Sequence, residues 1–574
     1  MRIPREAVAR RVGKVYIDRS SRKQPPGIHL RFASVHPRIE RPTGPGQPFT
    51  NHGMRKHHSQ SFGGGSASAG PPGAPHQASY DTGFFGHPRG LSTLFFTEMW
   101  ERFSYYGIRP LLILYMAAAL TDGGMGMTRD QAAPIVGIYG ASVYLASLPG
   151  GWIADRLMGL RRAIWYGGVL IALGHLAIAL SAVAGKGAFF LGLFLIVCGT
   201  GLLKPNISAI VGDLYPEGGA RRDAGFSIFY MGINVGALIA PLVTGYLGED
   251  VGWHYGFGAA GVGMVIGLIW YKVTADKTLG DIGQVPSGTE QERRQAMTYL
   301  GIGFAVLALI VLGVYASGMT PLDIANRMSI VMLTLAALYF GYLFFFAGLD
   351  TGEKKRVGVI VVLFAFATIF WSAFEQAPTS LNLFAADYTD RNIGGWEMPI
   401  LWLQSANSFF VIALAPVFAA LWVSLARRRG DLSSPAKFAL GLFFAAIGFA
   451  IMIYAARAVL AGGDGFRVSP WWLVASYFFQ TVGELCLSPV GLSSMTKLSP
   501  RRFTGQMMGV WFMAAAMGNL IAGIVGGHVD PENPAQMPAL FERTTISLLI
   551  ATVVLALLVI PIRRMMRETP RPAS

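Results

Sequence analysis

The chain has 574 residues, of which 52% are hydrophobic and only 14% are charged, and its mean hydropathy is +0.45. A soluble domain usually carries about 25% charged residues, so this composition excludes an ordinary soluble protein. The formal net charge is +15, but residues 1–92 hold 14 Lys and Arg against 4 Asp and Glu. The basic excess therefore lies mostly outside the apolar part, which argues against a nucleic-acid-binding domain.

The first 85 residues are predicted to form a disordered, basic cytoplasmic tail. They are rich in Gly, Pro, Ser, His and Arg and show no apolar periodicity. They also lack the apolar core of a secretory signal peptide. A basic arm that touches anionic lipid is the alternative interpretation of this segment.

Fourteen apolar segments follow, each of about the 20 residues that a helix needs to cross a hydrocarbon core of about 30 Å. The predicted spans are 92–120, 131–153, 162–184, 188–213, 224–247, 252–273, 297–315, 326–347, 357–385, 398–425, 434–457, 469–496, 503–526 and 541–562.

The predicted domains follow from these spans. Two six-helix bundles occupy 92–273 and 357–564, and a linker over 274–356 carries two extra membrane helices that lack charges in their interiors. We expect these two helices to form a lipid-facing hairpin. A second cytoplasmic tail is predicted over 565–574.

The distribution of Lys and Arg among the loops predicts the orientation. The loops on the side of the two termini contain 23 basic residues, and the loops on the other side contain 7. Because short cytoplasmic loops carry the excess of Lys and Arg, both termini are predicted to be cytoplasmic. We expect a multi-pass protein of the cell (inner) membrane.

The first span contains the unusually polar stretch EMWERFSYYGIRP. On a helix that turns 100° per residue, Glu98, Arg102, Tyr105 and Arg109 fall within about 60° of one another, and Glu101 lies about 60° to one side of Glu98. An ionised group at the centre of a bilayer is unfavourable by about 2.5–3.5 kcal/mol on insertion scales, so charged residues there are functional by default. This stripe is predicted to face the protein interior or water.

Three other charged residues stand inside apolar runs: Lys204 in GTGLLKPNISAI, Glu375 in IFWSAFEQAPTS and Glu484 in TVGELCLSPVG. Together with the first span, the membrane core holds four acids and three bases, a set that is neutral when it carries one proton. A static structural network is one interpretation. A proton relay coupled to transport is the favoured one, because seven such groups are rarely kept for stability alone.

Four further residues, Tyr144, Asn234, Asn407 and Trp511, are candidates that are individually more typical of helix packing. No zinc-ligand spacing, phosphate-binding loop or nucleophile elbow occurs in a suitable context, and the only two cysteines, Cys198 and Cys486, lie in apolar runs. We therefore expect no enzyme activity, metal or cofactor.

Four motifs together resemble the proton-dependent oligopeptide transporter (POT/PTR2) family of the major facilitator superfamily. Glu98-x-x-Glu101-Arg102-Phe-x-Tyr105-Tyr106-Gly resembles the family's ExxERFxYY signature. FYMGINVGAL (229–238) and FWSAFEQ (370–376) resemble its fifth-helix and seventh-helix motifs. GGWIADRLMGLRR (150–162) resembles the superfamily's loop motif. The similarity covers roughly 92–564, with fourteen helices as in bacterial di- and tripeptide transporters.

The resemblance implies uptake of di- and tripeptides, coupled to inward protons, by alternating access between two six-helix bundles. It assigns proton coupling to Glu98, Glu101, Arg102, Lys204 and Glu375. It assigns substrate binding to Tyr105, Tyr106, Arg109, Tyr144, Lys204, Asn234, Asn407, Glu484 and Trp511.

The resemblance also implies individual roles. Lys204 would exchange salt bridges with the glutamates and arginine of the first helix, and Glu375 would release Arg109 when it is protonated. Glu484 would hold the α-amino group of the peptide, while Arg109 and Lys204 attract its carboxylate. The functional unit is expected to be a monomer in the lipid bilayer.

The chain departs from the family pattern in two places. The second helix has no histidine where animal members carry one, so proton coupling is expected to rest on glutamates. After Trp511, the run FMAAAMGN has alanines where some relatives place a serine. A carrier of nitrate or another small anion, and a proton-coupled drug exporter, are the alternative functions on the same fold.

Overall fold

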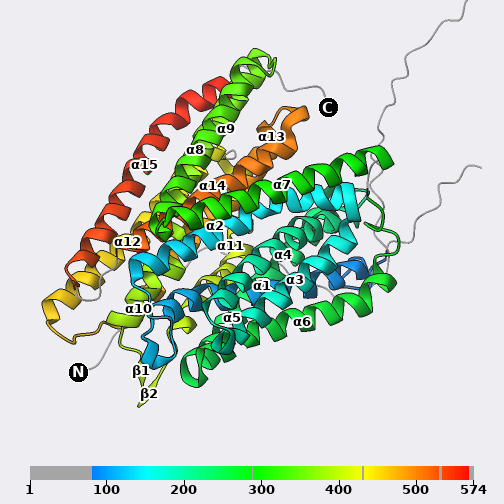
Figure 1. The fold of residues 1–574 in the computed structure, drawn as a ribbon. Helices are drawn as coiled ribbons and strands as arrows, with labels where there is room; N and C mark the ends of the chain where they lie inside the picture. Colours follow the sequence, from blue (N-terminus) through cyan, green and yellow to red (C-terminus); the bar gives the residue numbers. More distant parts are fainter. Residues whose placement is uncertain (1–80, 287–288, 430–431, 529–532, 568–574) are drawn as a thin grey trace, which may run out of the picture. The chain divides into compact units, whose positions relative to one another are not determined.

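A computed structural model of the chain describes residues 81–286, 289–429, 432–528 and 533–567. Residues 1–80 of the predicted N-terminal tail, and 568–574 of the C-terminal one, lie outside the described residues. Within the described part nearly every residue is helical, as predicted (Figure 1).

The N-terminal half contains six long helices, close to the predicted spans. They are α1 (Arg89–Ala117), α2 (Arg129–Ile153), α3 (Leu160–Ala184), α4 (Lys186–Asp213), α5 (Gly219–Gly245) and α6 (Trp253–Thr278). Helix α1 packs against α5 and α6, while α3 packs against α4 and α6, and α2 against α4. These contacts form the first of the two predicted six-helix groups.

Two further helices, α7 (Glu290–Ser317) and α8 (Pro321–Phe345), follow the first group. Each begins at a capping box, in which a threonine and an acidic residue three positions later bond to each other's backbone N–H groups; the pairs are Thr289 with Glu292 and Thr320 with Asp323. No residue in the most apolar stretch of α7 is buried, whereas α8 packs against α2 and α14. The exposed apolar surface of α7 agrees with the predicted lipid-facing hairpin.

The C-terminal half contains the second group of helices. They are α9 (Thr351–Phe374), α10 (Asn382–Tyr388), α11 (Ser405–Arg429), α12 (Ser434–Gly462), α13 (Trp471–Leu498), α14 (Thr504–Gly526) and α15 (Gln536–Arg567). Helix α12 packs against α13 and α15, and α9 packs against α14 and α15. Figure 1 shows α3 to α6 on one side of the molecule and α9, α12 and α15 on the other.

The predicted span 357–385 is correct in position but wrong as one continuous helix. Helix α9 ends at Phe374, and a wide turn, η4 (Ala377–Leu381), separates it from α10; in this turn the N–H of Leu381 donates to the carbonyl oxygen of Gln376 (3.1 Å). Pro378 has no N–H group, so it cannot continue the regular hydrogen-bond pattern here. The break falls directly at Glu375.

A second difference lies before α11, where the predicted span 398–425 starts with a tight turn, η5 (Ile400–Gln404). Just before it, β1 (Asn392–Ile393) pairs antiparallel with β2 (Trp396–Glu397), a small hairpin that the hydropathy pattern did not indicate. Gly394 and Gly395 form its turn with φ of 64° and 94°, values that glycine adopts without strain.

Twelve helical segments of the described chain are long and apolar enough to cross a membrane. The other two predicted spans correspond to α1 and α13. Helix α1 is more polar than the twelve because Glu98, Glu101, Arg102 and Arg109 stand in its middle and second half. Its length of 29 residues, about 44 Å at 1.5 Å per residue, is ample for a crossing.

Candidate functional site

The polar stripe of α1 is buried, as predicted. Glu98 and Glu101 are each 1% exposed, Arg102 is 2% exposed and Arg109 is 6% exposed, while the Tyr105 ring between the two arginines is also buried. The ring centroid of Tyr105 lies 5.1 Å from the Arg102 guanidinium carbon and 5.8 Å from that of Arg109. One side of α1 therefore places four charges in the interior of the protein.

The first cluster of the site consists of two carboxylates that share one guanidinium. Nε of Arg102 lies 3.3 Å from Oε1 of Glu98 and also pairs with Oε2 of Glu101. Within the described chain, Oε2 of Glu98 and Nη2 of Arg102 have no hydrogen-bond partner. The cluster carries one excess negative charge in a place shielded from water, so it becomes neutral when it takes up one proton.

The second cluster joins the two halves of the protein through Arg109. Its Nη2 lies 2.5 Å from Oε2 of Glu375 at the end of α9, and the same nitrogen donates to Oδ1 of Asn519 on α14. The expected Arg109–Glu375 pair is thus present. Because Glu375 stands at the break between α9 and η4, its position depends on that break.

The sequence interpretation missed Asn519, although it lies at the end of the run FMAAAMGN. Its approach to Arg109 depends on glycines of α2: a Cβ on Gly140 would clash with Oδ1 of Asn519, and a Cβ on Gly137 would come within 2.8 Å of its carbonyl oxygen. Helices α2 and α14 therefore pack closely at this point. The only indication of Asn519 in the sequence was its polar amide at the end of an otherwise apolar run.

Lys204 of α4 forms no ion pair with the first cluster. Its Nζ is 4.6 Å from the ring centroid of Tyr144 on α2, and that ring stacks with Phe512 of α14 at 6.4 Å. No carboxylate oxygen of the described residues lies within 4.0 Å of Lys204. The expected salt bridge to Glu98 or Glu101 is absent here, because Arg102 contacts both carboxylates.

Glu484 of α13 is, after Lys204, the second predicted charged site residue without an ion partner among the residues that the structure describes. Its Oε2 accepts a hydrogen bond from Nδ2 of Asn407 (3.3 Å), and the same amide donates to Oγ1 of Thr481 (2.8 Å). Glu484 and Asn407 are half-buried. The structure thus brings together two predicted residues and adds Thr481, one turn away on the same helix as Glu484.

The remaining predicted residues have less distinctive surroundings. Tyr106 contacts the Tyr105 ring edge-on, with ring centroids 5.1 Å apart, and the buried hydroxyl of Tyr105 has no partner within the described part. Asn234 donates to the carbonyl oxygen of Tyr230 on its own helix (3.0 Å). Trp511 is buried against Phe438 and Gly491 in the C-terminal half.

The two halves also meet at the end opposite the α6–α7 connection. There the guanidinium of Arg129 contacts both oxygens of Asp387 (2.6 and 2.8 Å), and Glu249 accepts the N–H groups of Ile400 and Leu401 (2.7 and 3.0 Å). These contacts link α2 with α10, and the wide turn that follows α5 (Tyr246–Val251) with η5. In this conformation, polar contacts hold the halves together at that end.

Comparison with known proteins gives a consistent result. The POT family (PTR2) matches residues 161–533. The peptide transporter YePEPT of Yersinia enterocolitica is 50% identical over 494 residues, which is 85% of this chain and 96% of the relative. The di-/tripeptide transporter of Lactococcus lactis subsp. lactis is 40% identical, covering 75% of this chain and 87% of the relative.

Solved structures agree with the sequence relatives. The crystal structure of a peptide transporter POT in complex with sulfate superposes with a TM-score of 0.79 and 42% identity, covering 85% of this chain and 98% of that chain. A POT family transporter in complex with 5-aminolevulinic acid gives a TM-score of 0.77 and 36% identity, covering 84% and 98%. The fold is therefore the predicted major facilitator fold, and the chain belongs to the POT family.

Proposed function

We propose that the protein is a symporter that imports di- and tripeptides together with protons by alternating access between its two halves. The observation that carries the proposal is a pair of opposite charges without ion partners among the described residues: Lys204 in the N-terminal half and Glu484 in the C-terminal half. A peptide zwitterion always offers an ammonium and a carboxylate, whatever its side chains.

The two ends of the peptide have separate partners in this proposal. The α-amino group binds Glu484, which Asn407 orients, and the α-carboxylate binds Lys204 and, when it is released, Arg109. Recognition of the ends alone tolerates variable side chains between them. The names of the relatives, peptide transporter and di-/tripeptide transporter, support this substrate class.

Proton coupling is proposed to act through the two clusters of α1. A proton on Glu375 removes its attraction to Arg109, which weakens a contact between the halves and frees the guanidinium for the carboxylate of the peptide. The Glu98–Glu101–Arg102 cluster stores a second exchangeable proton, since two carboxylates share one guanidinium. Proton and peptide then bias the same conformational equilibrium, for which a coupling of about 1–3 kcal/mol is ordinary.

Alternating access is supported by the contacts at the end opposite the α6–α7 connection. Arg129–Asp387 and the bonds of Glu249 close that end in the present conformation, and they must break for the site to open there. The predicted orientation makes this the external end. The structure would then correspond to a state closed to the outside.

The proposal is tested with the purified protein in liposomes, an inside-alkaline pH gradient and labelled dialanine. Accumulation above the external concentration that collapses when a protonophore is added is the expected result. Parallel assays with labelled nitrate and with a cationic dye test the two alternative functions. Uptake of nitrate without uptake of any di- or tripeptide would contradict the peptide assignment.

A further inference from the structure

A cavity of about 380 Å³ lies between α3 and α6, near the α2–α3 and α6–α7 connections and away from every residue of the proposed transport site. Its lining combines basic and aromatic side chains with one carboxylate. The residues that matter here are Arg161, Arg162, Trp165, Tyr166, Lys272 and Asp276.

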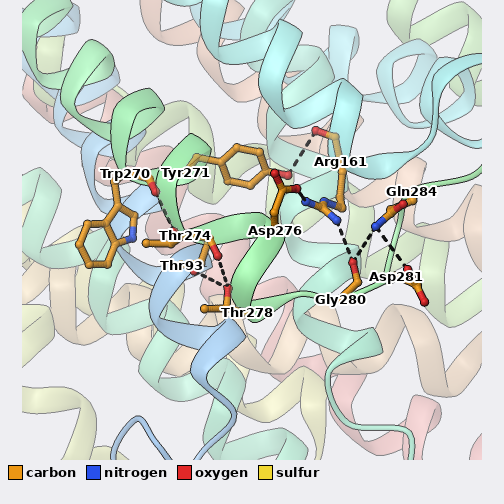
Figure 2. A network of polar contacts seen from close by, with 10 residues as sticks. All are labelled: Thr93, Arg161, Trp270, Tyr271, Thr274, Asp276, Thr278, Gly280, Asp281 and Gln284. Atoms are coloured by element: carbon orange, nitrogen blue, oxygen red, sulfur yellow. Dashed lines mark hydrogen bonds and ion pairs between the residues drawn. The ribbon is translucent and has the colours of Figure 1, made fainter.

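One wall of the cavity is a fixed polar network, shown in Figure 2. Nη1 of Arg161 donates to the carbonyl oxygen of Gly280 (2.8 Å), and its Nη2 pairs with Asp276. The backbone N–H of Arg161 donates to the carbonyl oxygen of Gly283 (3.0 Å), and its carbonyl oxygen accepts from the hydroxyl of Tyr271 (3.2 Å). Arg161 is buried and its charge is matched by Asp276, so this pair adds no net charge to the cavity.

Two further lining residues, one on α3 and one on α6, carry positive charge. Arg162 and Lys272 are exposed, and neither lies within 4.0 Å of a carboxylate oxygen of any described residue. The Nζ of Lys272 lies 5.6 Å from the ring centroid of Trp165, which holds the ammonium beside the cavity. Because Arg161 balances the charge of Asp276, Arg162 and Lys272 give the cavity a net positive charge, which suits an anion.

The position of the cavity along the helices indicates the source of the anion. Arg162 is the third residue of α3, and Lys272 stands six residues before the end of α6, so the cavity lies where these membrane helices reach the polar boundary. Trp165 and Tyr166 are the residue types enriched at that boundary. Along the same two helices, toward the bilayer centre, Leu173, Leu176, Val265 and Ile269 are exposed apolar side chains.

We propose that this cavity binds the phosphate headgroup of an anionic phospholipid. Arg162 and Lys272 neutralise the phosphate, Trp165 and Tyr166 cover the glycerol region, and the acyl chains lie on the exposed apolar surface of α3 and α6. Basic pockets between transmembrane helices are known to bind such headgroups. A free phosphate ion would use the two cations but would gain nothing from the apolar surface below them.

The test is native mass spectrometry of the full chain in detergent, titrated with phosphatidylglycerol and, separately, with phosphatidylcholine. The variant Arg162→Gln/Lys272→Gln removes both cations from the cavity. The control variant Lys277→Gln/Arg293→Gln removes the same charge from exposed positions near the same connection that do not line the cavity. All four positions are exposed, so folding is expected to survive, and a thermal unfolding curve verifies it.

We expect one tightly held phosphatidylglycerol on the unaltered protein and on the control variant. On the cavity variant the affinity should fall about 25-fold, because each Lys or Arg near an anionic lipid surface contributes about 1 kcal/mol and 1.4 kcal/mol corresponds to tenfold. Phosphatidylcholine should bind weakly to all three proteins.

Three results would overturn the proposal. Equal phosphatidylglycerol binding by the cavity variant and the unaltered protein would show that Arg162 and Lys272 do not bind the lipid. An equal loss of phosphatidylglycerol affinity in the control variant would show that the lipid responds to the general surface charge and not to the cavity. Displacement of the lipid by millimolar inorganic phosphate or glycerophosphate would indicate a free-phosphate site instead. Lipid binding is measured without transport, so these results are independent of the proposed symport.

Discussion

Arg102 and Arg109 stand two turns apart on one helix, but at the scale of single residues they have different contact partners. Arg102 lies between two carboxylates of its own helix, whereas Arg109 contacts a carboxylate of α9 and an amide of α14. A proton added to the Glu98–Glu101–Arg102 cluster removes one negative charge within the N-terminal half. A proton added to Glu375 weakens a contact between the halves.

At Glu484 we predict that the charge, rather than the shape, of the side chain binds the peptide. Glu484→Gln keeps the size and can still accept from Asn407, but it cannot pair with an ammonium. A hydrogen bond to a charged group contributes about 1.5–3 kcal/mol, so the KM for dialanine should rise about 10- to 100-fold. The KM is measured from the dependence of uptake into liposomes on dialanine concentration.

A matched control for this prediction is Glu542→Gln, at the partly exposed ion pair between α15 and Arg457 of α12, which should leave the KM unchanged. The unaltered protein should also reject N-acetyl-dialanine, which has no ammonium, and Glu484→Gln should no longer discriminate between the two peptides. An unchanged KM for dialanine in Glu484→Gln would refute the assignment.

At Asn519 we predict that a carboxylate would hold the halves together. In Asn519→Asp, Arg109 would keep an ionic partner even when Glu375 is protonated. Replacing the neutral amide acceptor of the Arg109 guanidinium by a carboxylate adds about 1–2 kcal/mol, so turnover should slow about 5- to 30-fold while dialanine still binds. Initial uptake rates and a thermal-shift titration separate the two effects, with Asn519→Ser as the control. A normal turnover rate in Asn519→Asp would show that Asn519 does not control the contact between the halves.

The sequence predicted Arg109 and Glu375 but not Asn519, and the reason is physical. A charge inside an apolar run is costly enough to indicate function by itself, whereas a buried amide is satisfied by many helix contacts. The contact of Asn519 with Arg109, beside the close approach of α2 at Gly137 and Gly140, becomes visible only in the folded structure.

At the scale of helices and their connections, the break after α9 is the feature that hydropathy could not predict. The whole segment from 357 to 385 is apolar, so composition indicates one helix, while the missing N–H of Pro378 and the cross-half pair of Glu375 decide that it is interrupted. The starts of α7 and α8, in contrast, follow from local capping residues. The predicted spans nevertheless begin at 297 and 326, after the observed starts at Glu290 and Pro321, because the polar first turns of both helices lie outside the apolar runs.

The contact between α2 and α10 gives a prediction at this scale. Arg129→Asp would place two carboxylates together opposite the α6–α7 connection, and Asp387→Arg would place two guanidinium groups there. Each single reversal should lower the uptake rate, and the double reversal should restore much of it, with a coupling of about 0.5–3 kcal/mol. The uptake rates of the unaltered protein, the two single reversals and the double reversal form a double-mutant cycle. Additive losses in the double reversal would show that the pair does not couple the helices.

The segment before α1 gives a pH-dependent prediction outside the membrane spans. Nδ1 of His87 lies 2.8 Å from the hydroxyl of Tyr215 in the α4–α5 connection. Burial, and then repulsion from Arg221, lower the pKa of His87 below its ordinary value of 6.5. Because the folded state binds this proton less readily than the unfolded state, stability should fall as the pH drops through 6.5.

The measurement compares the melting temperature of the unaltered protein with that of His87→Gln at pH 7.5 and pH 5.5. The glutamine side chain of the variant would have no proton to gain, so the loss on acidification should be smaller there. Tyr215→Phe is the control, which removes the hydroxyl but leaves the histidine to titrate. Identical pH dependence of the unaltered protein and His87→Gln would contradict the assignment.

At the scale of the whole molecule, the N-terminal and C-terminal groups of helices meet through contacts around Arg109 and opposite the α6–α7 connection. The sequence predicted the positions of the long helices because each apolar segment is recognisable alone, but it joined α9 and α10 into one helix. It did not predict which conformation the halves adopt. That depends on pairs such as Arg129–Asp387, whose members are 258 positions apart.

The central claim is that each peptide enters with protons, and proton movement itself tests it most directly. Liposomes that contain the protein and an internal pH dye start with equal pH on both sides and a potassium-clamped, inside-negative potential. Adding dialanine should acidify the lumen, whereas N-acetyl-dialanine should not, and Glu484→Gln should respond only at much higher dialanine concentrations. Entry of labelled dialanine without acidification of the lumen would contradict proton-coupled symport.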